Sequence, residues 1–287
     1  MNAALDLRPS PIAGQWYPGD PERLAREVDG YVAAARMPAI SGQVVAVMAP
    51  HAGHRYSGPV AGYAFAALRG LSPEVVAVIS PMHYPYEQPL LTSAHEAYVT
   101  PLGVIPVDSA AVEALDERLQ ELLGFGLTRV ANDPEHSLEI ELPFLQRVLS
   151  DPFNLLPVMV RDQSEHTSQV LGEALAGVLA DRRALLVASS DLSHYYPQNL
   201  ANSLDDEMLR QVAAFDPQGV IHIEEAGKGF ACGRAAVAAV LWAARGLGAD
   251  GVQILHYATS GDVTGDYSQV VGYGAAVMTR SVTQGPS

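Results

Sequence analysis

Short runs of consecutive apolar residues recur along the chain, and a turn signal follows each of them. Val44–Met48, Val75–Ile79 and Ala184–Ala188 each hold five apolar residues. Valine-rich runs of this length suit strands that are buried on both faces of a sheet. Segments with helical periodicity separate the runs; one begins at Pro21, with Asp20 as its expected N-cap. This alternation predicts an α/β fold with a central, mainly parallel or mixed sheet and helices on both faces.

The rest of the chain continues this alternation. Leu90–Asp108 is expected to be extended, with a hairpin turn at 101–103. Pro143 should kink or restart the helix that contains it. Further helices are expected over 109–123, 134–149, 166–179, 203–215, 217–225 and 233–245, and further strands over 155–160, 252–259 and 270–279.

No repeat and no linker divides the chain, so we expect one domain over 1–287. Residues 1–20 should form an ordered arm, because Trp16 and Tyr17 favour burial. Residues 281–287 should form a flexible tail.

Composition narrows the class of protein. Of 287 residues, 48% are hydrophobic and 17% charged, which allows a large core. The formal net charge of −15 argues against binding to nucleic acid or to an anionic membrane surface. No apolar run is long enough to span a membrane, and the single cysteine, Cys232, excludes an intramolecular disulfide. We therefore expect a soluble, cytoplasmic protein.

Three histidines occupy equivalent places in this pattern. His51, His83 and His194 each follow one of the three apolar runs, after a proline or small residues. A single histidine in such a place is more often a cap or a core residue. The carboxyl ends of parallel strands meet at one sheet edge, however, where ligands bind in α/β folds. The repetition therefore predicts that the three imidazoles share a site.

Two further residues extend this constellation. Neutral imidazole binds zinc, iron and copper, and a carboxylate or thiolate often completes the ligand set. Asp191 and Cys232 could supply those groups. Cys232 precedes the helix expected from Gly233, and a helix N-terminus would lower the pKa of its thiol. The alternative is that Cys232 is a small buried apolar residue.

The remaining histidines have less specific interpretations. His136 lies in the first turn of a predicted helix, where it would support a ligand or cap the helix. His54 and His95 are expected at the rim of the site or on the surface, and His256 in the core. No phosphate-binding loop, dinucleotide fingerprint or Gly-x-Ser-x-Gly motif is present, so nucleotide binding and serine hydrolysis lack support.

Many separate short motifs follow one another along the chain: Ala13–Pro18, Ala49–Gly53, Ser57–Gly58, Pro81–His83, Thr100–Gly103, Glu135–Glu139, Leu142–Phe144, Ser189–His194 and Cys232–Arg234. In this order they resemble the Memo family, whose bacterial and archaeal members are called AmmeMemoRadiSam system protein B. His54 departs from the family pattern, which has an aromatic residue there.

The resemblance implies a fold similar to that of class III extradiol (LigB-type) dioxygenases. It implies that His51, His83 and Cys232 bind a metal, with Fe²⁺ favoured over copper or zinc. His194 would then be the acid/base group, with Asp191 beside it. Cysteine in place of the carboxylate ligand of the dioxygenases argues against simple ring-cleaving chemistry. Trp16, Tyr56 and His136 are expected to contact substrate or to support the ligands.

Three functions remain open at this point. The first is a mononuclear metalloprotein of oxidoreductase type that acts on an unknown small molecule. The second is a binding module that recognises a peptide or a partner protein of the AmmeMemoRadiSam system in the same pocket. The third is a cysteine hydrolase that uses Cys232, His194 and Asp191.

Overall fold

A computed structural model describes residues 5–281. Residues 1–4 of the expected arm and 282–287 of the expected tail lie outside the described residues. Ser281, the last described residue, donates its backbone N–H to Asp250 Oδ1 at 2.9 Å.

The chain is organised around a mixed sheet that has nine strands among the described residues. Its centre is parallel: β2, β9, β3 and β8 lie side by side in one direction. β12 joins β2 antiparallel, and β4 joins β8 antiparallel. This confirms the predicted mixed sheet. In spatial order the strands are β10 (His194–Tyr196), β12 (Val270–Arg280), β2 (Gln43–Ala49), β9 (Ala184–Ser189), β3 (Val75–Pro81), β8 (Asn154–Val160), β4 (Leu90–Ser93) and β7 (Thr128–Val130), with β11 (Gly251–Thr259) also paired to β12.

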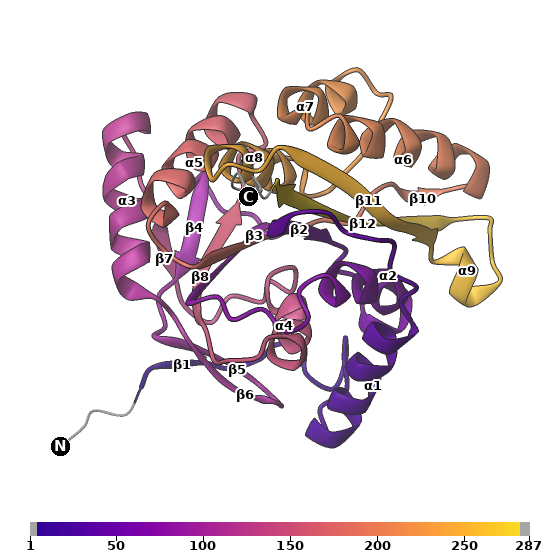
Figure 1. Cartoon of the computed structure of the whole chain (residues 1–287), viewed down its shortest axis with the longest axis horizontal. Coiled ribbons are helices and arrows are strands. Elements are labelled where there is room, and N and C mark those ends of the chain that lie inside the picture. Colours follow the sequence, from indigo (N-terminus) through magenta and orange to yellow (C-terminus); the bar gives the residue numbers. More distant parts are fainter. Residues whose placement is uncertain (1–4, 282–287) are drawn as a thin grey trace, which may run out of the picture.

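Helices cover both faces of the sheet (Figure 1). Alternate residues of β3 show why: Val75, Ala77 and Ile79 enter one apolar core, whereas Val76 and Val78 enter the other. Continuous apolar strands therefore supply both cores at once. One core holds α3 (Ser109–Leu123), α5 (Glu165–Leu179), α6 (Gln198–Ala213), α7 (Pro217–Glu225) and α8 (Arg234–Gly246), and the other holds α1 (Pro21–Ala34), α2 (His54–Ala66) and α4 (Leu142–Val148). The short α9 (Gly261–Thr264) connects β11 to β12.

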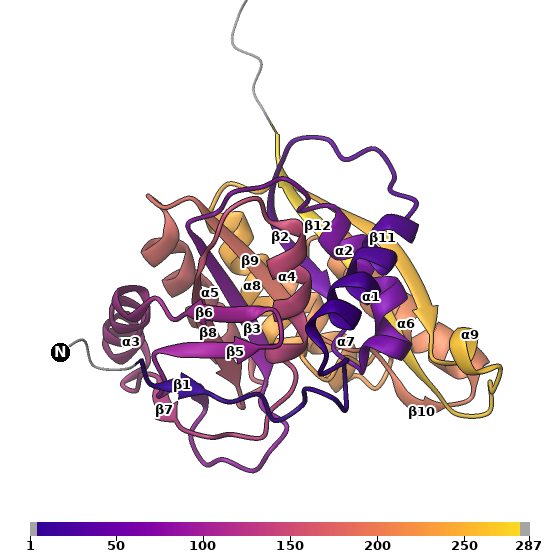
Figure 2. The same ribbon diagram turned by 90° about the horizontal axis from the view of Figure 1, so that it is seen from below.

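A second, three-stranded sheet consists of β1 (Leu7–Arg8), β5 (Ala97–Thr100) and β6 (Gly103–Pro106), which lie side by side in Figure 2. β5 and β6 form the predicted hairpin, and the turn needs glycine because Gly103 has φ +131°. β1 pairs parallel with β5. The N-terminal arm therefore contributes a strand to this second sheet.

The expected helix over 134–149 is much shorter in the structure. Residues 131–138 form an irregular loop, a 3₁₀ turn covers Glu139–Glu141, and α4 begins at Leu142 with Pro143 in its first turn. Burial of polar groups explains the difference, because Glu135 and Glu139 are almost fully buried and bond to residues elsewhere in the fold. These long-range bonds replace the first helical turns.

Other boundaries agree closely with expectation. Asp20 caps α1 by accepting the Arg23 N–H at 2.8 Å, and Pro21 occupies the first turn. α6 begins at Gln198, earlier than the predicted 203. None of the helices within residues 5–281 is long and apolar enough to cross a bilayer.

Candidate metal centre

The site lies at the carboxyl edge of three adjacent parallel strands. β9 sits between β2 and β3 in the sheet, and all three run in the same direction. His51 follows β2, His83 follows β3, and the segment leading to His194 follows β9. All three residues therefore lie at the carboxyl edge of the sheet, as predicted, but His194 is not one of the three clustered imidazoles.

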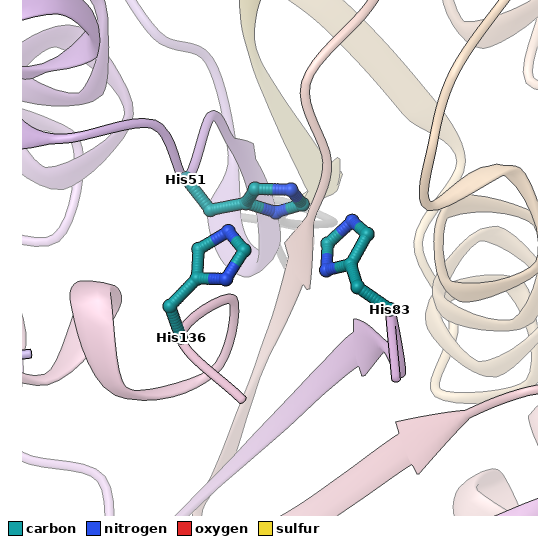
Figure 3. A group of neighbouring side chains, drawn as sticks. All are labelled: His51, His83 and His136. Carbon is teal, nitrogen blue, oxygen red and sulfur yellow. The ribbon is translucent and has the colours of Figure 1, made fainter. Parts of the chain in front are cut away.

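Three imidazoles form the core of the site. His51, His83 and His136 each place one ring nitrogen within 4.8 Å of the others, and their rings face one another in Figure 3. The ring of His51 is 5.3 Å from that of His83 and 5.4 Å from that of His136, centroid to centroid. The rings of His83 and His136 stack at 4.9 Å. His136, expected only as a supporting residue, is therefore a member of the cluster.

The tautomer of His51 follows from its neighbour Ser189. His51 Nδ1 lies 2.9 Å from Ser189 Oγ, and that hydroxyl lies 2.6 Å from the carbonyl oxygen of Ser137. Because a carbonyl can only accept, the Ser189 hydroxyl donates to it and accepts the Nδ1–H of His51. The Nε2 lone pair of His51 is left free for a metal.

Glu135 orients the other two rings. Its Oε1 lies 2.9 Å from Nδ1 of His83 and 3.2 Å from Nδ1 of His136. The carboxylate also accepts the backbone N–H groups of His83 (2.6 Å), His136 (2.9 Å) and Ser137 (2.9 Å). Burial alone would raise the pKa of Glu135, but the His83 hydrogen bond and neighbouring charges lower it to about 2. Glu135 is therefore an ionised acceptor that holds the Nδ1–H of His83 and leaves Nε2 of that ring free for a metal.

Two of the clustered imidazoles are held neutral. Burial, aided by the other histidines, lowers the pKa of His51 well below its usual value. Burial likewise lowers the pKa of His136 to about 4. Neutral imidazole is the form that binds metal, so these two rings are ready to coordinate an ion at neutral pH.

Asp191 has a different partner from the expected one. Its Oδ1 accepts the backbone N–H of His51 at 2.7 Å and that of Ala52 at 3.3 Å. The Nδ1–H of His194 is instead donated to the carbonyl oxygen of Leu192 at 2.8 Å. Burial raises the pKa of Asp191 to about 7, against the effect of the two backbone bonds. Asp191 thus fixes the backbone at the end of β2, and a backbone carbonyl orients His194.

Cys232 lies against His51, with Sγ 3.2 Å from Nε2. Two ligands of one tetrahedral metal lie about 3.5 Å apart. Cys232 is nevertheless not a member of the cluster formed by His51, His83 and His136. The predicted low pKa is wrong for the metal-free protein: burial and the charge of Asp191 raise the pKa of the thiol well above its usual value. A β-carbon at Gly233 would lie 2.6 Å from the Ser189 carbonyl, which explains the glycine that follows Cys232.

The hydrolase arrangement is not formed. Cys232 contacts His51, His194 bonds to a backbone carbonyl, and Asp191 bonds to backbone N–H groups. The predicted triad of Cys232, His194 and Asp191 is therefore absent, and the imidazole beside the thiol is that of His51. The raised pKa of the thiol argues against this chemistry as well.

A cavity of about 630 Å³ adjoins the cluster. Trp16, Tyr56 and Tyr273 line it, together with Ala52, the residue after His51. The indole of Trp16 also stacks on the His136 ring, with centroids 4.0 Å apart. Trp16 and Tyr56 therefore both line this cavity, whereas none of the three clustered histidines does.

A second cavity, of about 590 Å³, lies at the opposite, amino edge of the sheet. Arg182, Arg183 and Arg280 line it, beside the C-terminal ends of α5 and α8. Arginines stabilise such ends because helix C-termini carry partial negative charge, and Arg280 donates to the Leu247 carbonyl at 3.4 Å. The cavity is remote from the histidines and is not part of this site.

Two loop histidines are more buried than expected. His54 is 1% exposed and donates its Nε2–H to the Ile140 carbonyl at 3.1 Å. His95 is also buried, beside Asp6 and Asn132. Neither is a surface residue, so that expectation is wrong for both.

Comparison with known proteins agrees with the family resemblance that the short sequence motifs suggested. A family model described as Memo-like protein matches residues 8–277. A MEMO1 family protein of Nitrosopumilus maritimus is 34% identical over 273 residues, which cover 94% of this chain and 98% of that protein. One from Methanopyrus kandleri is 37% identical over 279 residues, with coverages of 94% and 98%. The crystal structure of an uncharacterized protein from Escherichia coli K12 aligns with a TM-score of 0.49 at 13% identity, covering 82% of this chain and 100% of that one. The family match over nearly the whole chain shows that the protein belongs to the Memo-like family.

Proposed function

We propose that the protein is a mononuclear metalloprotein whose ion binds at His51 and His83, with His136 and Cys232 as the further ligands. One observation carries this proposal: Nδ1 of His51 is hydrogen-bonded to Ser189 and Nδ1 of His83 to Glu135, so that the Nε2 lone pair of each of these rings is available to a metal. Metal-ligating histidines are typically oriented in this way through their second nitrogen.

The donor set fits a transition metal better than magnesium or calcium, which prefer oxygen ligands. Imidazole suits iron, copper and zinc, and the thiol of Cys232 would shift preference toward copper or zinc. We propose Fe²⁺ as the resident ion, as the family resemblance implies, with copper or zinc as alternatives.

We propose a redox or dioxygenase-like activity on a small molecule that enters the 630 Å³ cavity. A bound ferrous ion would supply coordination positions for oxygen and substrate. Trp16 and Tyr56 would bind the substrate, since they line the cavity and are each more than a third exposed. His194, with Nδ1 tied to Leu192, would hold or accept a proton at Nε2.

Metal analysis of the protein purified without oxygen tests this proposal. The wild type should carry one equivalent of metal, and His51→Ala and His83→Ala should lose most of it. His256→Ala is a matched control, because His256 stacks on Tyr63 outside the cluster. Wild-type protein that neither retains nor binds Fe²⁺, copper or zinc would refute the proposal.

The same cavity supports a second candidate, a module that binds a peptide or a partner protein of the AmmeMemoRadiSam system. The exposed aromatic rings of Trp16 and Tyr56 favour it, because such rings are common at recognition surfaces. If metal removal leaves partner affinity unchanged while Trp16→Ala abolishes it, this second function is the correct one.

A further inference from the structure

Arg8 lies in a buried ionic network beside the metal centre. It is 2% exposed, although it belongs to the short strand β1 near the start of the chain. Its guanidinium forms a fork with Asp133: Nε lies 3.0 Å from Oδ2, and Nη2 lies 2.9 Å from Oδ1. Nη1 lies 2.5 Å from Glu139 Oε2, and Nη2 also donates to the Glu135 carbonyl at 2.9 Å.

These contacts span the loop that supplies His136. Asp133 and Glu139 flank this loop, and the Glu135 carbonyl lies between them. Arg8 therefore holds the loop at its beginning, its middle and its end. No regular secondary structure covers 131–138, so the position of the His136 ring depends on such contacts.

The rest of the N-terminal arm supports the same loop. Ser10 and Tyr17 both donate hydroxyl hydrogen bonds to Glu139 Oε1, the latter at 2.6 Å. Trp16 stacks on the His136 ring with centroids 4.0 Å apart. The arm thus contacts both the loop backbone and the ring that the loop presents.

The charges explain why a guanidinium is needed. Asp133 and Glu139 are both almost fully buried, and Arg8 is the cation that pairs with both. Burial raises the pKa of Glu139 in spite of Arg8, which shows how little solvent reaches this network. A lysine would keep the charge but lose the planar fork, so it could not hold Asp133 and Glu139 in the same geometry.

We infer that Arg8 is a positioning residue of the metal centre, one that places His136 against His51 and His83 by holding the 133–139 loop. The N-terminal arm is then a structural component of the site. The inference rests on the proposed metal-binding function, and its test includes a measurement that needs no metal.

The first measurement is Co²⁺ affinity and absorption spectrum for Arg8→Lys. Arg182→Lys is the matched control, because Arg182 also bridges two carboxylates, Glu74 at 2.9 Å and Asp108 at 2.8 Å, at the far edge of the sheet. Arg8→Lys should bind Co²⁺ about 10–100-fold more weakly with an altered spectrum, and the control should match wild type. In a His136→Ala background, Arg8→Lys should cause no further loss. A folded Arg8→Lys protein with wild-type affinity and spectrum would overturn the inference.

The second measurement uses the Trp16–His136 stack in the metal-free protein. Trp242→Phe leaves Trp16 as the single tryptophan, since the chain has two. In that background, Arg8→Lys should shift Trp16 emission in the same direction as His136→Ala does. Emission identical to the parent would overturn the inference. If wild type binds no Co²⁺ but Arg8→Lys still shifts the emission, the proposed function fails and the positioning role of Arg8 stands.

A milder variant tests the same network if Arg8→Lys does not fold. Asp133→Asn removes one carboxylate charge from the network and keeps the shape of the side chain. It should weaken Co²⁺ binding and shift Trp16 emission in the same directions as Arg8→Lys, by smaller amounts. An unchanged affinity and emission in a folded Asp133→Asn protein would contradict the role of the network.

Discussion

Glu135 Oε1 lies 2.9 Å from Nδ1 of His83, and this contact fixes which nitrogen of the ring faces the centre of the site. The same oxygen lies 3.2 Å from Nδ1 of His136. One buried carboxylate therefore orients two of the three clustered imidazoles. The side chain of His83 remains 33% exposed, so its ring is held by Glu135 and still reaches solvent.

Glu135→Gln should weaken metal binding by about 10–100-fold, because an amide is a weaker acceptor and can accept through one atom only. Glu141→Gln is the control. Burial raises the pKa of Glu141 well above its usual value, which favours its protonated form, and glutamine has a similar shape. Competition with a metal-binding dye measures both affinities. Equal losses in the two variants would show that charge at Glu135 is unimportant.

Comparison of His136→Ala with Cys232→Ser should reveal how much each of the two side chains contributes to metal affinity. His136→Ala should weaken Fe²⁺ and Co²⁺ as strongly as His51→Ala does, because its ring nitrogen lies in the same cluster. Cys232→Ser should weaken copper and zinc more than Fe²⁺, since a hydroxyl replaces a soft ligand. Affinities for the separate metals check this. Cys232→Ser protein with unchanged affinity for all of them would remove the thiol from the ligand set.

Alkylation of Cys232 provides a separate test of its environment. The raised pKa predicts slow alkylation of the metal-free protein at pH 7, since the thiolate is the reactive form. A bound metal would deprotonate the thiol but also cover it, so the rate should stay low. The pH profile of the alkylation rate in the metal-free protein measures the pKa. A fast reaction at pH 7 would contradict the structure.

His194→Ala should leave metal content near that of wild type and abolish turnover, if His194 transfers protons. Its Nδ1 is tied to the Leu192 carbonyl, and it lies outside the three-histidine cluster. Metal content and activity of the same preparation check the prediction. A metal loss equal to that of His51→Ala would make His194 a ligand instead.

The sheet and its three histidines were predictable because their signals are local. A valine-rich run followed by a proline or small residues marks the end of a buried strand, whatever surrounds it. His51, His83 and His194 each stand at such an end. Their common sheet edge then required only that the strands be parallel, which the alternation with helices indicates, although His194 lies outside the three-histidine cluster.

The place of His136 was not predictable in the same way. Its loop has no periodic pattern, and Arg8, which lies more than 120 residues earlier in the chain, holds it. The prediction of a low pKa for the Cys232 thiol was wrong for a related reason. A helix N-terminus is a local feature, but burial and the charge of Asp191 come from the tertiary fold and outweigh it. An acidic residue directly before a histidine, as in Glu135-His136, is the one signal in the local sequence that could have pointed to this loop as part of the site.

His54 should make stability depend on pH between about 4 and 6.5. Burial lowers the pKa of His54 from 6.5 to about 4. The folded state holds His54 in its neutral form. The stability that neutral His54 contributes is therefore fully present above its unfolded pKa of 6.5 and is lost as the pH falls toward its folded pKa of about 4. The loss should approach about 3 kcal/mol of unfolding free energy near pH 4. Urea unfolding at a series of pH values measures it.

His54→Gln separates this residue from the other titrating groups. Glutamine can still donate to the Ile140 carbonyl that the His54 Nε2–H contacts, but it does not titrate. The variant should therefore lose less stability than wild type between pH 6.5 and 4, although His51 and His136 still contribute to the slope. Because the carboxylate of Glu27 lies 4.0 Å from Nδ1 of His54, Glu27→Gln should make the wild-type slope steeper by removing a charge that favours protonation. Parallel curves for wild type and His54→Gln would show that His54 is not held neutral in the folded protein.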